Sequence, residues 1–449
     1  MFCASRKKHY LCYAINVKKE RKTMKHRVQA ILIGLLIPLV IYALPTYYDS
    51  AKGGVHQLFK AGKGKYVIRH AHRFQETLEI PSDCELRFAG GRLSGPIVFH
   101  DTQLSGRVNL KGSRIQGTLS NKVFNASWLC AMDGQTDDAP CINEMIAVCG
   151  NVFFPRGTYR LVSPYHKEKF HIGIRQDNVT LTGEEGTVFL TKERLGMVCV
   201  FTKPYDIANS VRNVQLKGIT FRTKNDGSVF LEWTHAIQSK GVNGFTVENC
   251  TIEDFWGDGI CLNHYGDNPE TGERSRNQNV RIINNTIVGG VFHNNRNGIS
   301  VINGKNVLIK GNVIRNTSRH DMPGAIDVEP NNSAYTMENI RIEGNIIEGS
   351  YGNCGAIEIC MVNGGPGRHI YVENNVIRNS NLGIYIVLHT DDTTEHFVIR
   401  KNYVAADTPP YKFVGRGKSK DWTISGNTFL RPTQERIPGR LHIENLQVR

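Results

Sequence analysis

A segment of nine residues returns seven times between positions 244 and 429, and its spacing limits the folds open to this chain. Apolar and polar residues alternate within each copy, as they do in a β-strand. Successive copies start 35, 27, 33, 30, 27 and 25 residues apart. Repeats at about 20–50 residues indicate stacked supersecondary units. The copies are GFTVENCTI from Gly244, NVRIINNTI from Asn279, NVLIKGNVI from Asn306, NIRIEGNII from Asn339, HIYVENNVI from His369, HFVIRKNYV from His396 and DWTISGNTF from Asp421.

The seventh position of the repeat is asparagine in six of the seven copies. Asparagine tolerates a left-handed backbone, and its amide can bond the asparagine of the next coil. We therefore expect these side chains to stack in a ladder. They are Asn285, Asn312, Asn345, Asn375, Asn402 and Asn427, with Cys250 in the remaining copy.

Short strands and polar turns without crossover helices predict an all-β solenoid, a parallel β-helix that climbs by one strand per coil. A β-propeller repeats at a similar length. Its blades need four antiparallel strands with hairpin signals, and the chain has too few of either. A solenoid grows in one dimension, so 449 residues can form one body of roughly ten coils.

The formal charge of +14 is concentrated at the start of the chain, where residues 1–28 contribute +8. The remaining +6 fits an anionic substrate or an ordinary soluble surface, and we expect no nucleic-acid partner. Residues 1–23 look like an over-long start. Residues 24–48 have a basic start and an apolar run, typical of a signal peptide or an uncleaved membrane anchor. We therefore expect an exported protein whose only membrane contact is this segment.

Eleven cysteines do not form an evident disulfide framework, because nine remain after the apolar segment and they are widely spread. The sequence contains no C-x-x-C pair, so it does not predict a zinc site. Cys250, Cys261 and Cys360 lie on expected strands, where stacked small residues are a more common role than metal ligation.

The rest of the chain divides around a short helix. Residues 49–125 are expected to be a β-rich N-terminal extension, 126–432 the β-helix and 433–449 a loosely attached tail. A helix is expected near 137–149. Thr136 can cap it, and its apolar stripe is Ile142, Met145, Ile146 and Cys149. Such a helix would cover the open end of the solenoid.

The stretch DGQTDDAPCINEMIAVCGNVFFPRGTYRL closely resembles the opening of the pectate-lyase-like superfamily of right-handed parallel β-helix proteins, and LRFAGGRLSG resembles the N-terminal extension of its secreted bacterial members. That superfamily includes polysaccharide lyases, glycoside hydrolases and phage tailspikes. The resemblance spans roughly residues 60–430. It implies a right-handed coil and a polysaccharide partner, but it does not select one reaction.

A second strand follows each copy of the repeat, as in GICLNH, GISVIN, AIDVEP, AIEICM and GIYIVL. Aligned as rungs, these strands place Ile326, Val328, Ile357 and Ile359 in the core. The outward row then contains Asp327, Glu358 and Tyr385, and the next outward row contains Glu329. Asp327, Glu329 and Glu358 are therefore the candidate catalytic residues.

Strand geometry puts these carboxylates at catalytic separations. Residues i and i+2 lie about 6.5–7 Å apart, and adjacent rungs about 4.8 Å apart. Retaining glycosidases hold two carboxylates about 5–5.5 Å apart and inverting ones about 6.5–9.5 Å apart. Clustered acids also raise one pKa, as a general acid requires. We expect hydrolysis of an acidic glycan in a lateral groove, with Asp327 as the best single candidate.

Charged and aromatic residues flank this face and are expected to contact the substrate. The candidates are Asp258, His264, Arg296, Arg319, His320 and Tyr385.

Two alternatives stay open. A polysaccharide lyase would use the same acids to bind Ca²⁺, with Arg296 or Arg319 as base. A non-catalytic carbohydrate-binding protein or surface adhesin would instead present aromatic platforms, for which Trp233, Trp256 and Tyr265 are candidates. The sequence fixes neither the glycan nor the oligomeric state, and no cofactor is expected other than Ca²⁺ in the lyase case.

Overall fold

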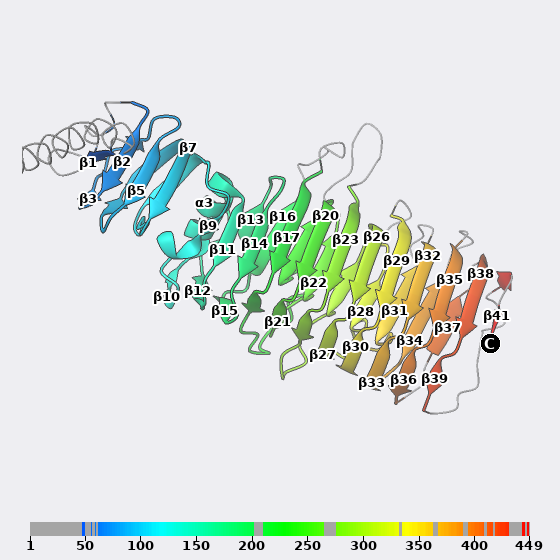
Figure 1. The fold of residues 1–449 in the computed structure, drawn as a ribbon. Coiled ribbons are helices and arrows are strands. Elements are labelled where there is room, and N and C mark those ends of the chain that lie inside the picture. The colour runs from blue at the N-terminus through cyan, green and yellow to red at the C-terminus, as the bar shows by residue number, and fades with distance from the viewer. Residues whose placement is uncertain are drawn as a thin grey trace, which may run out of the picture.

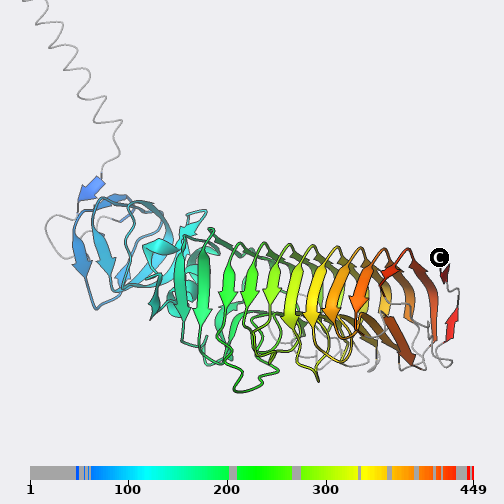
Figure 2. The same cartoon turned by 90° about the horizontal axis from the view of Figure 1, so that it is seen from below.

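The computed structural model describes residues 62–201, 210–264, 275–331, 335–361, 367–388, 394–407, 411–415 and 418–430, together with 47–49, 55, 59, 442–444 and 447–448. Three parallel sheets run along the molecule, and most coils contribute one strand to each of them (Figure 1). Seen from below, the strands form a regular stack that follows the order of the chain (Figure 2).

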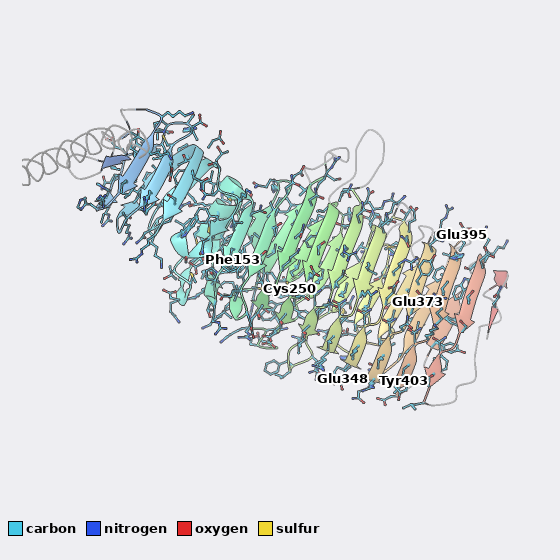
Figure 3. The ribbon with its side chains drawn as sticks, in the orientation of Figure 1. Phe153, Cys250, Glu348, Glu373, Glu395 and Tyr403 are labelled. Carbon is cyan, nitrogen blue, oxygen red and sulfur yellow. A yellow bond between two sulfur atoms is a disulfide. The ribbon has the colours of Figure 1, made fainter. Side chains whose placement is uncertain are left out.

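Sheet 1 carries the asparagine-rich repeats, and sheet 2 follows it in each coil. Sheet 1 consists of β9 (Phe124–Asn125), β11 (Asn151–Phe154), β14 (Thr180–Gly183), β17 (Arg212–Lys217), β20 (Asn243–Glu248), β23 (Asn277–Ile283), β26 (Gly304–Lys310), β29 (Met337–Glu343), β32 (Gly367–Glu373), β35 (Thr394–Arg400), β38 (Lys418–Ser425), β40 (His442–Glu444) and β41 (Gln447–Val448). Sheet 2 consists of β10 (Asp133–Asp137), β12 (Gly157–Leu161), β15 (Thr187–Thr191), β18 (Thr220–Arg222), β21 (Thr251–Glu253), β24 (Thr286–Val288), β27 (Val313–Thr317), β30 (Ile346–Ser350), β33 (Val376–Ser380), β36 (Tyr403–Ala406) and β39 (Thr428–Phe429). Glu348 and Tyr403 project from sheet 2 (Figure 3).

Sheet 3 carries the row of candidate acids. It consists of β13 (Phe170–Ile174), β16 (Gly196–Phe201), β19 (Ile237–Lys240), β22 (Ile260–Asn263), β25 (Ile299–Val301), β28 (Ile326–Val328), β31 (Ile357–Met361), β34 (Ile384–Leu388) and β37 (Tyr411–Gly415). Its nine strands, with eleven in sheet 2, agree with the expected ten or so coils. All strand pairs in the described part of the chain are parallel, which excludes the propeller.

One aliphatic core fills the solenoid. Ile326, Val328, Ile357 and Ile359 are completely buried in it, as the register predicted. The same core continues into the N-terminal extension through residues such as Leu86. Stacked Ile and Val side chains suit it because β-branched residues pack well on a pleated surface.

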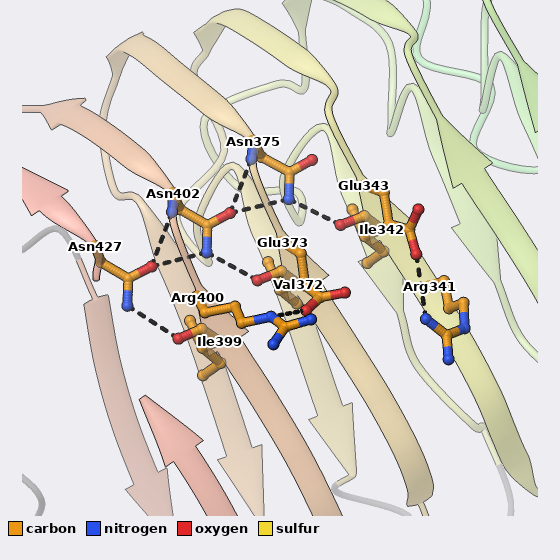
Figure 4. Close-up of polar contacts among 10 residues, drawn as sticks. All are labelled: Arg341, Ile342, Glu343, Val372, Glu373, Asn375, Ile399, Arg400, Asn402 and Asn427. Atoms are coloured by element: carbon orange, nitrogen blue, oxygen red, sulfur yellow. Dashed lines mark hydrogen bonds and ion pairs between the residues drawn. The ribbon is translucent and has the colours of Figure 1, made fainter. Parts of the chain in front are cut away.

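The asparagine ladder is present. The Nδ2 atoms of Asn375 and Asn402 each donate at 3.0 Å to the Oδ1 of the asparagine one coil later, and each also donates to a strand carbonyl (Figure 4). The same Oδ1 atoms accept backbone N–H groups. Cys250 continues the ladder: its N–H donates to Asn285 and its thiol faces the Leu216 carbonyl. Each amide thus satisfies buried groups on neighbouring coils.

The left-handed turn residue lies one position earlier than we expected. Residues with positive φ immediately precede the ladder, as at Asn284, Gly311, Gly344, Asn374 and Lys401. The ladder asparagine is therefore selected by its side-chain hydrogen bonds, while its neighbour supplies the left-handed backbone.

A second ladder, not predicted from the sequence, runs along the first position of the repeat. Asn279, Asn306 and Asn339 have φ near +54° and are linked by 3.0 Å side-chain hydrogen bonds. His369 and His396 continue this row, with ring centroids 4.9 Å apart.

Helix α3 (Ala139–Cys149) covers the first coils, packing against β8, β11, β12 and β13. Its apolar stripe is buried except for half-buried Cys149. The expected Thr136 cap is wrong: Thr136 belongs to β10 and bonds Asp133, and Asp138 occupies the N-cap position. The Asp138 carboxylate accepts instead from the N–H groups of Ala131 and Met132.

The N-terminal extension is itself built from parallel strands, and it precedes α3 at one end of the molecule (Figure 1). Its strands are β1 (Tyr47–Asp49), β2 (Lys65–Ile68), β3 (Ala71–Arg73), β4 (Leu78–Glu79), β5 (Glu85–Phe88), β6 (Arg92–Ser94), β7 (Pro96–Gly106) and β8 (Arg114–Leu119), followed by the short helix η2 (Ala126–Trp128). At the other end, β40 and β41 pair with β38, so the described part of the tail continues sheet 1 rather than hanging loosely.

One disulfide, Cys130–Cys141, ties the loop before α3 to the helix. The cysteine spacing did not predict it, because the pairing depends on how the loop folds back. Cys250, Cys261 and Cys360 form no disulfide with another described residue and are buried, in agreement with a packing role. No helix among the described residues is long and apolar enough to cross a bilayer. The apolar segment within 24–48 lies outside the described residues.

Candidate active site

The outer side of sheet 3 carries one row of residues in strict register. Asp327 pairs with Ser300 on one side and with Glu358 on the other, and Glu358 pairs with Tyr385. The predicted outward row is therefore confirmed by the strand register. Alternation along β28 and β31 places the acids opposite the aliphatic core.

The guanidinium of Arg296 joins the acids together. Its Nη2 lies 3.6 Å from Asp327 Oδ2 and 3.6 Å from Glu329 Oε2. Its Nη1 lies 3.6 Å from Asp258 Oδ2, and its Nε lies 3.9 Å from Glu232 Oε1. Arg296 is 7% exposed, so these ion pairs form largely out of water. A buried cation of this kind compensates acids that could not otherwise ionise.

Burial departs from the expected groove floor. Asp327 is 0% and Glu358 is 4% exposed, whereas the Glu329 side chain is 24% exposed. Asp327 and Glu358 point away from the core. The side chains of Arg296 and Asn297 lie against Asp327, whereas Glu358 keeps a small exposed fraction. Of the three candidate acids, Glu329 has the most contact with solvent.

A hydrogen-bond row holds Asp327 in place. Asn297 Nδ2 donates to Asp327 Oδ2 and to Ser300 Oγ, each at 2.9 Å. The N–H of Asn297 donates to Asp258 Oδ1 at 3.1 Å. Asp327 Oδ1 and Glu358 Oε2 are buried without a hydrogen-bond partner among the described residues. Unpaired buried acceptors are costly when charged, so this arrangement favours the protonated form of both acids.

The surroundings move the pKa values of these acids apart. Burial, followed by repulsion from Glu329, raises the pKa of Glu358 to about 8. Burial and the neighbouring Glu358 raise the pKa of Asp327 well above its ordinary value. Burial also raises the pKa of Glu329, against the opposing effect of Arg296. Glu358 is therefore protonated at neutral pH, the state a general acid needs.

Asp258 behaves in the opposite way. Burial alone would raise its pKa, but Arg296 and then His235 lower it to about 2. His235 Nδ1 lies 3.1 Å from Asp258 Oδ2. Asp258 is 0% exposed and holds Arg296 from the side away from solvent, so the predicted direct contact with substrate is wrong in this geometry.

Arg319 and His320 line a neighbouring cavity of about 660 Å³. The cavity also includes Phe292, His293 and Tyr351. The Arg319 guanidinium is held by Asp321 at 2.6 and 2.5 Å and lies over the Phe230 ring. None of the candidate acids lines this cavity, and the charge of Arg319 is already compensated by Asp321.

The other two flanking candidates have separate surroundings. Tyr385 is half-buried next to Glu358, and Lys412 Nζ lies 5.2 Å from its ring centroid. His264, at the far end of β22, stacks against Tyr335, whose hydroxyl lies 2.8 Å from His264 Nε2. Tyr335 packs on Cys261 and Ile302.

Sequence reasoning missed His235 and Glu232. His235, Asp258 and Asn297 occupy the same position before three successive strands of sheet 3, since the Ala236 N–H bonds Asp258 O and the Gly259 N–H bonds Asn297 O. Including the strand AIQSK in the rung alignment would have revealed His235. Glu232 lies in a loop outside the repeat, so only the folded structure brings it to Arg296.

Metal binding is poorly supported by the donors present. His235, Asp258 and Cys261 offer three ligand atoms within 4.8 Å of one another. However, the Arg296 guanidinium already lies beside Asp258, and burial raises the pKa of the Cys261 thiol well above its ordinary value. Arg296 also stands between Asp258, Asp327 and Glu329, where a Ca²⁺ ion would meet its positive charge. These residues therefore do not fit a Ca²⁺ site centred on the three acids.

Comparison with known proteins supports the fold. Residues 235–429 match the family described as right handed beta helix region. The chain is a right-handed parallel β-helix protein. The expected resemblance to the pectate-lyase-like superfamily is thus confirmed at the level of the fold, and no curated protein sequence matches the chain.

The chain also resembles several solved structures at low sequence identity. ORF18 of Geobacillus virus E2 is 15% identical with a TM-score of 0.47, and the match covers 73% of this chain but only 60% of the viral one. An exopolygalacturonase from Thermotoga maritima is 14% identical with a TM-score of 0.44, covering 73% of this chain and 92% of the enzyme. The Streptococcus pneumoniae surface protein and adhesin PfbA is 13% identical with a TM-score of 0.43, covering 73% and 97%.

Proposed function

We propose that this β-helix protein is an exported enzyme that hydrolyses glycosidic bonds of an acidic polysaccharide on the outer face of sheet 3. The observation that carries the proposal is the pair Glu358 and Glu329 beside one buried arginine. Glu358 has a pKa of about 8 and Glu329 is partly exposed. Such a pair supplies a proton donor and a carboxylate at one place.

The two acids have different roles in this mechanism. Glu358 gives its proton to the glycosidic oxygen as the bond from that oxygen to the anomeric carbon breaks. Glu329 takes a proton from the water that attacks the same carbon. One rung and two residues separate them, roughly 8 Å between Cα atoms by strand geometry.

Asp327 and Arg296 position the pair. Asp327 lies one rung from Glu358, and this neighbour adds to burial in raising the pKa of Asp327. Arg296 holds Asp327 and Glu329 from the same side. We therefore place Asp327, the leading sequence candidate, beneath the reacting groups rather than against the substrate.

A calcium-dependent lyase is less favoured, because the guanidinium of Arg296 lies among the acids that would hold the ion. A binding protein without catalysis is the second candidate. Trp233 is 67% exposed and follows Glu232, which lies against Arg296, so an aromatic platform lies next to the acids. Trp256 is buried, and Tyr265 lies outside the described residues.

The test is a panel of acidic and neutral polysaccharides incubated with wild type, Glu358→Gln, Glu329→Gln and Asp327→Asn. Glu348→Gln is the matched control, because Glu348 lies on sheet 2 in an exposed pair with Arg315. Reducing ends and absorbance of unsaturated products are recorded with and without a chelator. We expect cleavage without unsaturated product, a loss of about 10²–10⁴-fold in Glu358→Gln and full activity in the control.

Other outcomes separate the alternatives. An unsaturated product that disappears with the chelator would establish the lyase. Unchanged turnover in all three sheet 3 variants would refute the site. Binding of a polysaccharide without turnover of any of them would support a binding protein without catalysis.

A further inference from the structure

The N-terminal extension carries the positive charge of the folded part of the molecule. Residues 62–125 contain ten Lys or Arg and five Asp or Glu, a net charge of +5. Residues 1–61 carry +9, which leaves residues 126–449 with no net charge out of the total of +14. The net positive charge that follows residue 61 is therefore confined to the N-terminal extension, residues 62–125.

Many surface cations of both regions pair with acids, but two arginines of the extension do not. On the β-helix, surface cations face acids, as in Arg315–Glu348, Lys310–Glu343 and Arg368–Glu395. In the extension, Arg73 and Arg92 form no ion pair with any residue in the described part of the chain. Uncompensated arginines attract anions, because a guanidinium matches carboxylate and sulfate geometry.

Both arginines line a cavity of about 900 Å³. Arg73 lies on β3 and Arg92 on β6, and these strands pair so that Ala71 is opposite Arg92 and Arg73 opposite Ser94. Phe74 adds an aromatic wall and is partly buried against the core. The volume falls within the range of about 300–1,000 Å³ that is usual for ligand sites.

The guanidinium of Arg92 is fixed before any ligand arrives. Its Nε donates to the Lys111 carbonyl at 2.9 Å. A Cβ on Gly112 would come within 3.1 Å of Arg92 Nη2 and 2.9 Å of Ser94 Oγ. Gly112 also has φ of +83°, a conformation that disfavours other residues. The missing side chain leaves room beside both the guanidinium and the hydroxyl.

We propose that this cavity is a second polysaccharide site, which binds a carboxylate or sulfate group of an acidic glycan between Arg73 and Arg92. The identity of the polymer rests on the proposed function, whereas the anion site rests on the extension alone. Its concave shape and the wall formed by Phe74 suit a sugar unit better than a flat membrane surface. The site would hold the polymer at one end of the molecule while sheet 3 acts on another part of it.

The experiment measures binding of polygalacturonate to the full chain by isothermal titration calorimetry. Every protein in this binding assay carries Glu358→Gln so that cleavage does not interfere. Combining Arg73→Gln with Arg92→Gln is expected to weaken binding by about tenfold or more at low salt. The control pair is Arg315→Gln with Arg368→Gln, which removes two cations from the β-helix and should leave the affinity unchanged. Neutral dextran should not bind at the extension.

Binding affinity tests the second site, whereas cleavage of polysaccharide tests the proposed function, so the two can fail separately. Equal affinity in the arginine variant and the control would refute the second site, whatever the wild-type enzyme cleaves. Loss of affinity in the arginine variant supports it even if no polysaccharide is cleaved. If phosphatidylglycerol vesicles bind with the same arginine dependence while polygalacturonate does not, the glycan assignment is overturned in favour of a lipid surface.

Discussion

At the scale of single residues, Arg296 determines the ionisation of the acids around it. It lies within 4 Å of Asp258, Asp327, Glu329 and Glu232, and it is buried with the first two. Asp258 consequently stays ionised, while burial outweighs this cation for Asp327 and Glu329. One cation thus produces both low and high pKa values within a single cluster.

Replacing Arg296 with Met should destabilise the protein by about 3–5 kcal/mol, because it leaves buried acids without their cation. Equilibrium unfolding in urea measures the change. Arg315→Met is the control, since its exposed pair with Glu348 contributes about 0–1 kcal/mol. Equal effects at the two positions would show that the Arg296 cluster has no special energetic role.

The raised pKa of Glu358 in the folded state predicts that the free energy of unfolding falls as the pH rises. Its folded pKa of about 8 lies above its ordinary value of 4.5, so between these pH values the folded state holds a proton that the unfolded state has lost. Stability from this group is complete below about pH 4.5 and declines by at most about 1.4 kcal/mol per pH unit until the folded pKa is passed. Unfolding of wild type and Glu358→Gln from pH 5 to 8 should give a flatter profile for the variant. Glu348→Gln should keep the wild-type profile, and parallel profiles for all three proteins would contradict the assignment.

At the scale of elements, each coil is held to the next by side chains as well as by strands. The seventh-position ladder is buried and bonds backbone groups, whereas the first-position ladder is exposed and bonds mainly itself. We therefore expect each buried seventh-position asparagine to stabilise the fold more than an exposed first-position one.

Asn345→Ala should destabilise the protein by about 1–3 kcal/mol, because buried N–H and carbonyl groups lose their partner. Asn306→Gly in the exposed ladder keeps the left-handed backbone accessible, so it should have a smaller effect. Urea unfolding of both variants compares the two ladders. Similar losses would mean that Asn345 contributes no more than a surface turn residue.

Cys250→Asn should extend the buried ladder by one coil. The thiol lies 3.5 Å from the Leu216 carbonyl, the place where a ladder amide would donate, and Asn285 is the next acceptor along. A completed hydrogen bond contributes about 0.5–1.5 kcal/mol, so thermal unfolding should shift upward. Cys250→Ala, which cannot make these bonds, should shift it downward, and a loss of similar size in both variants would refute this prediction.

At the scale of the whole molecule, charge divides the chain into a basic start, a basic extension and a neutral β-helix. The Cys130–Cys141 disulfide lies between the extension and the β-helix. Disulfides persist in oxidising compartments, which agrees with the export that residues 24–48 predict.

Expression of the full chain in a bacterial host should place it outside the cytoplasm, whereas a chain lacking residues 24–48 should stay inside. Thiol labelling after cell fractionation checks both location and the state of Cys130 and Cys141. We expect these cysteines to be oxidised in the exported protein and reduced in the shortened one. Cytoplasmic full-length protein would contradict the export prediction.

The sequence by itself determined the architecture, because a period of two within each strand and a period near 30 between coils admit few folds. Register followed from the aliphatic row: a one-residue slip would have put Ile326 and Val328 outside the core. The stacking of Asp327 on Glu358 and the buried asparagine ladder follow from the same repeat.

Only the tertiary structure decided what covers the acids and which cations accompany them. Loops outside the repeat bring Arg296 and Glu232 against sheet 3, and their path depends on contacts that no periodicity encodes. The same loops bury Asp327 and leave Glu329 partly exposed, which separates two acids that look alike in the sequence. The disulfide and the arginine-lined cavity of the extension were likewise settled by folding, since each joins residues whose spacing carries no signal.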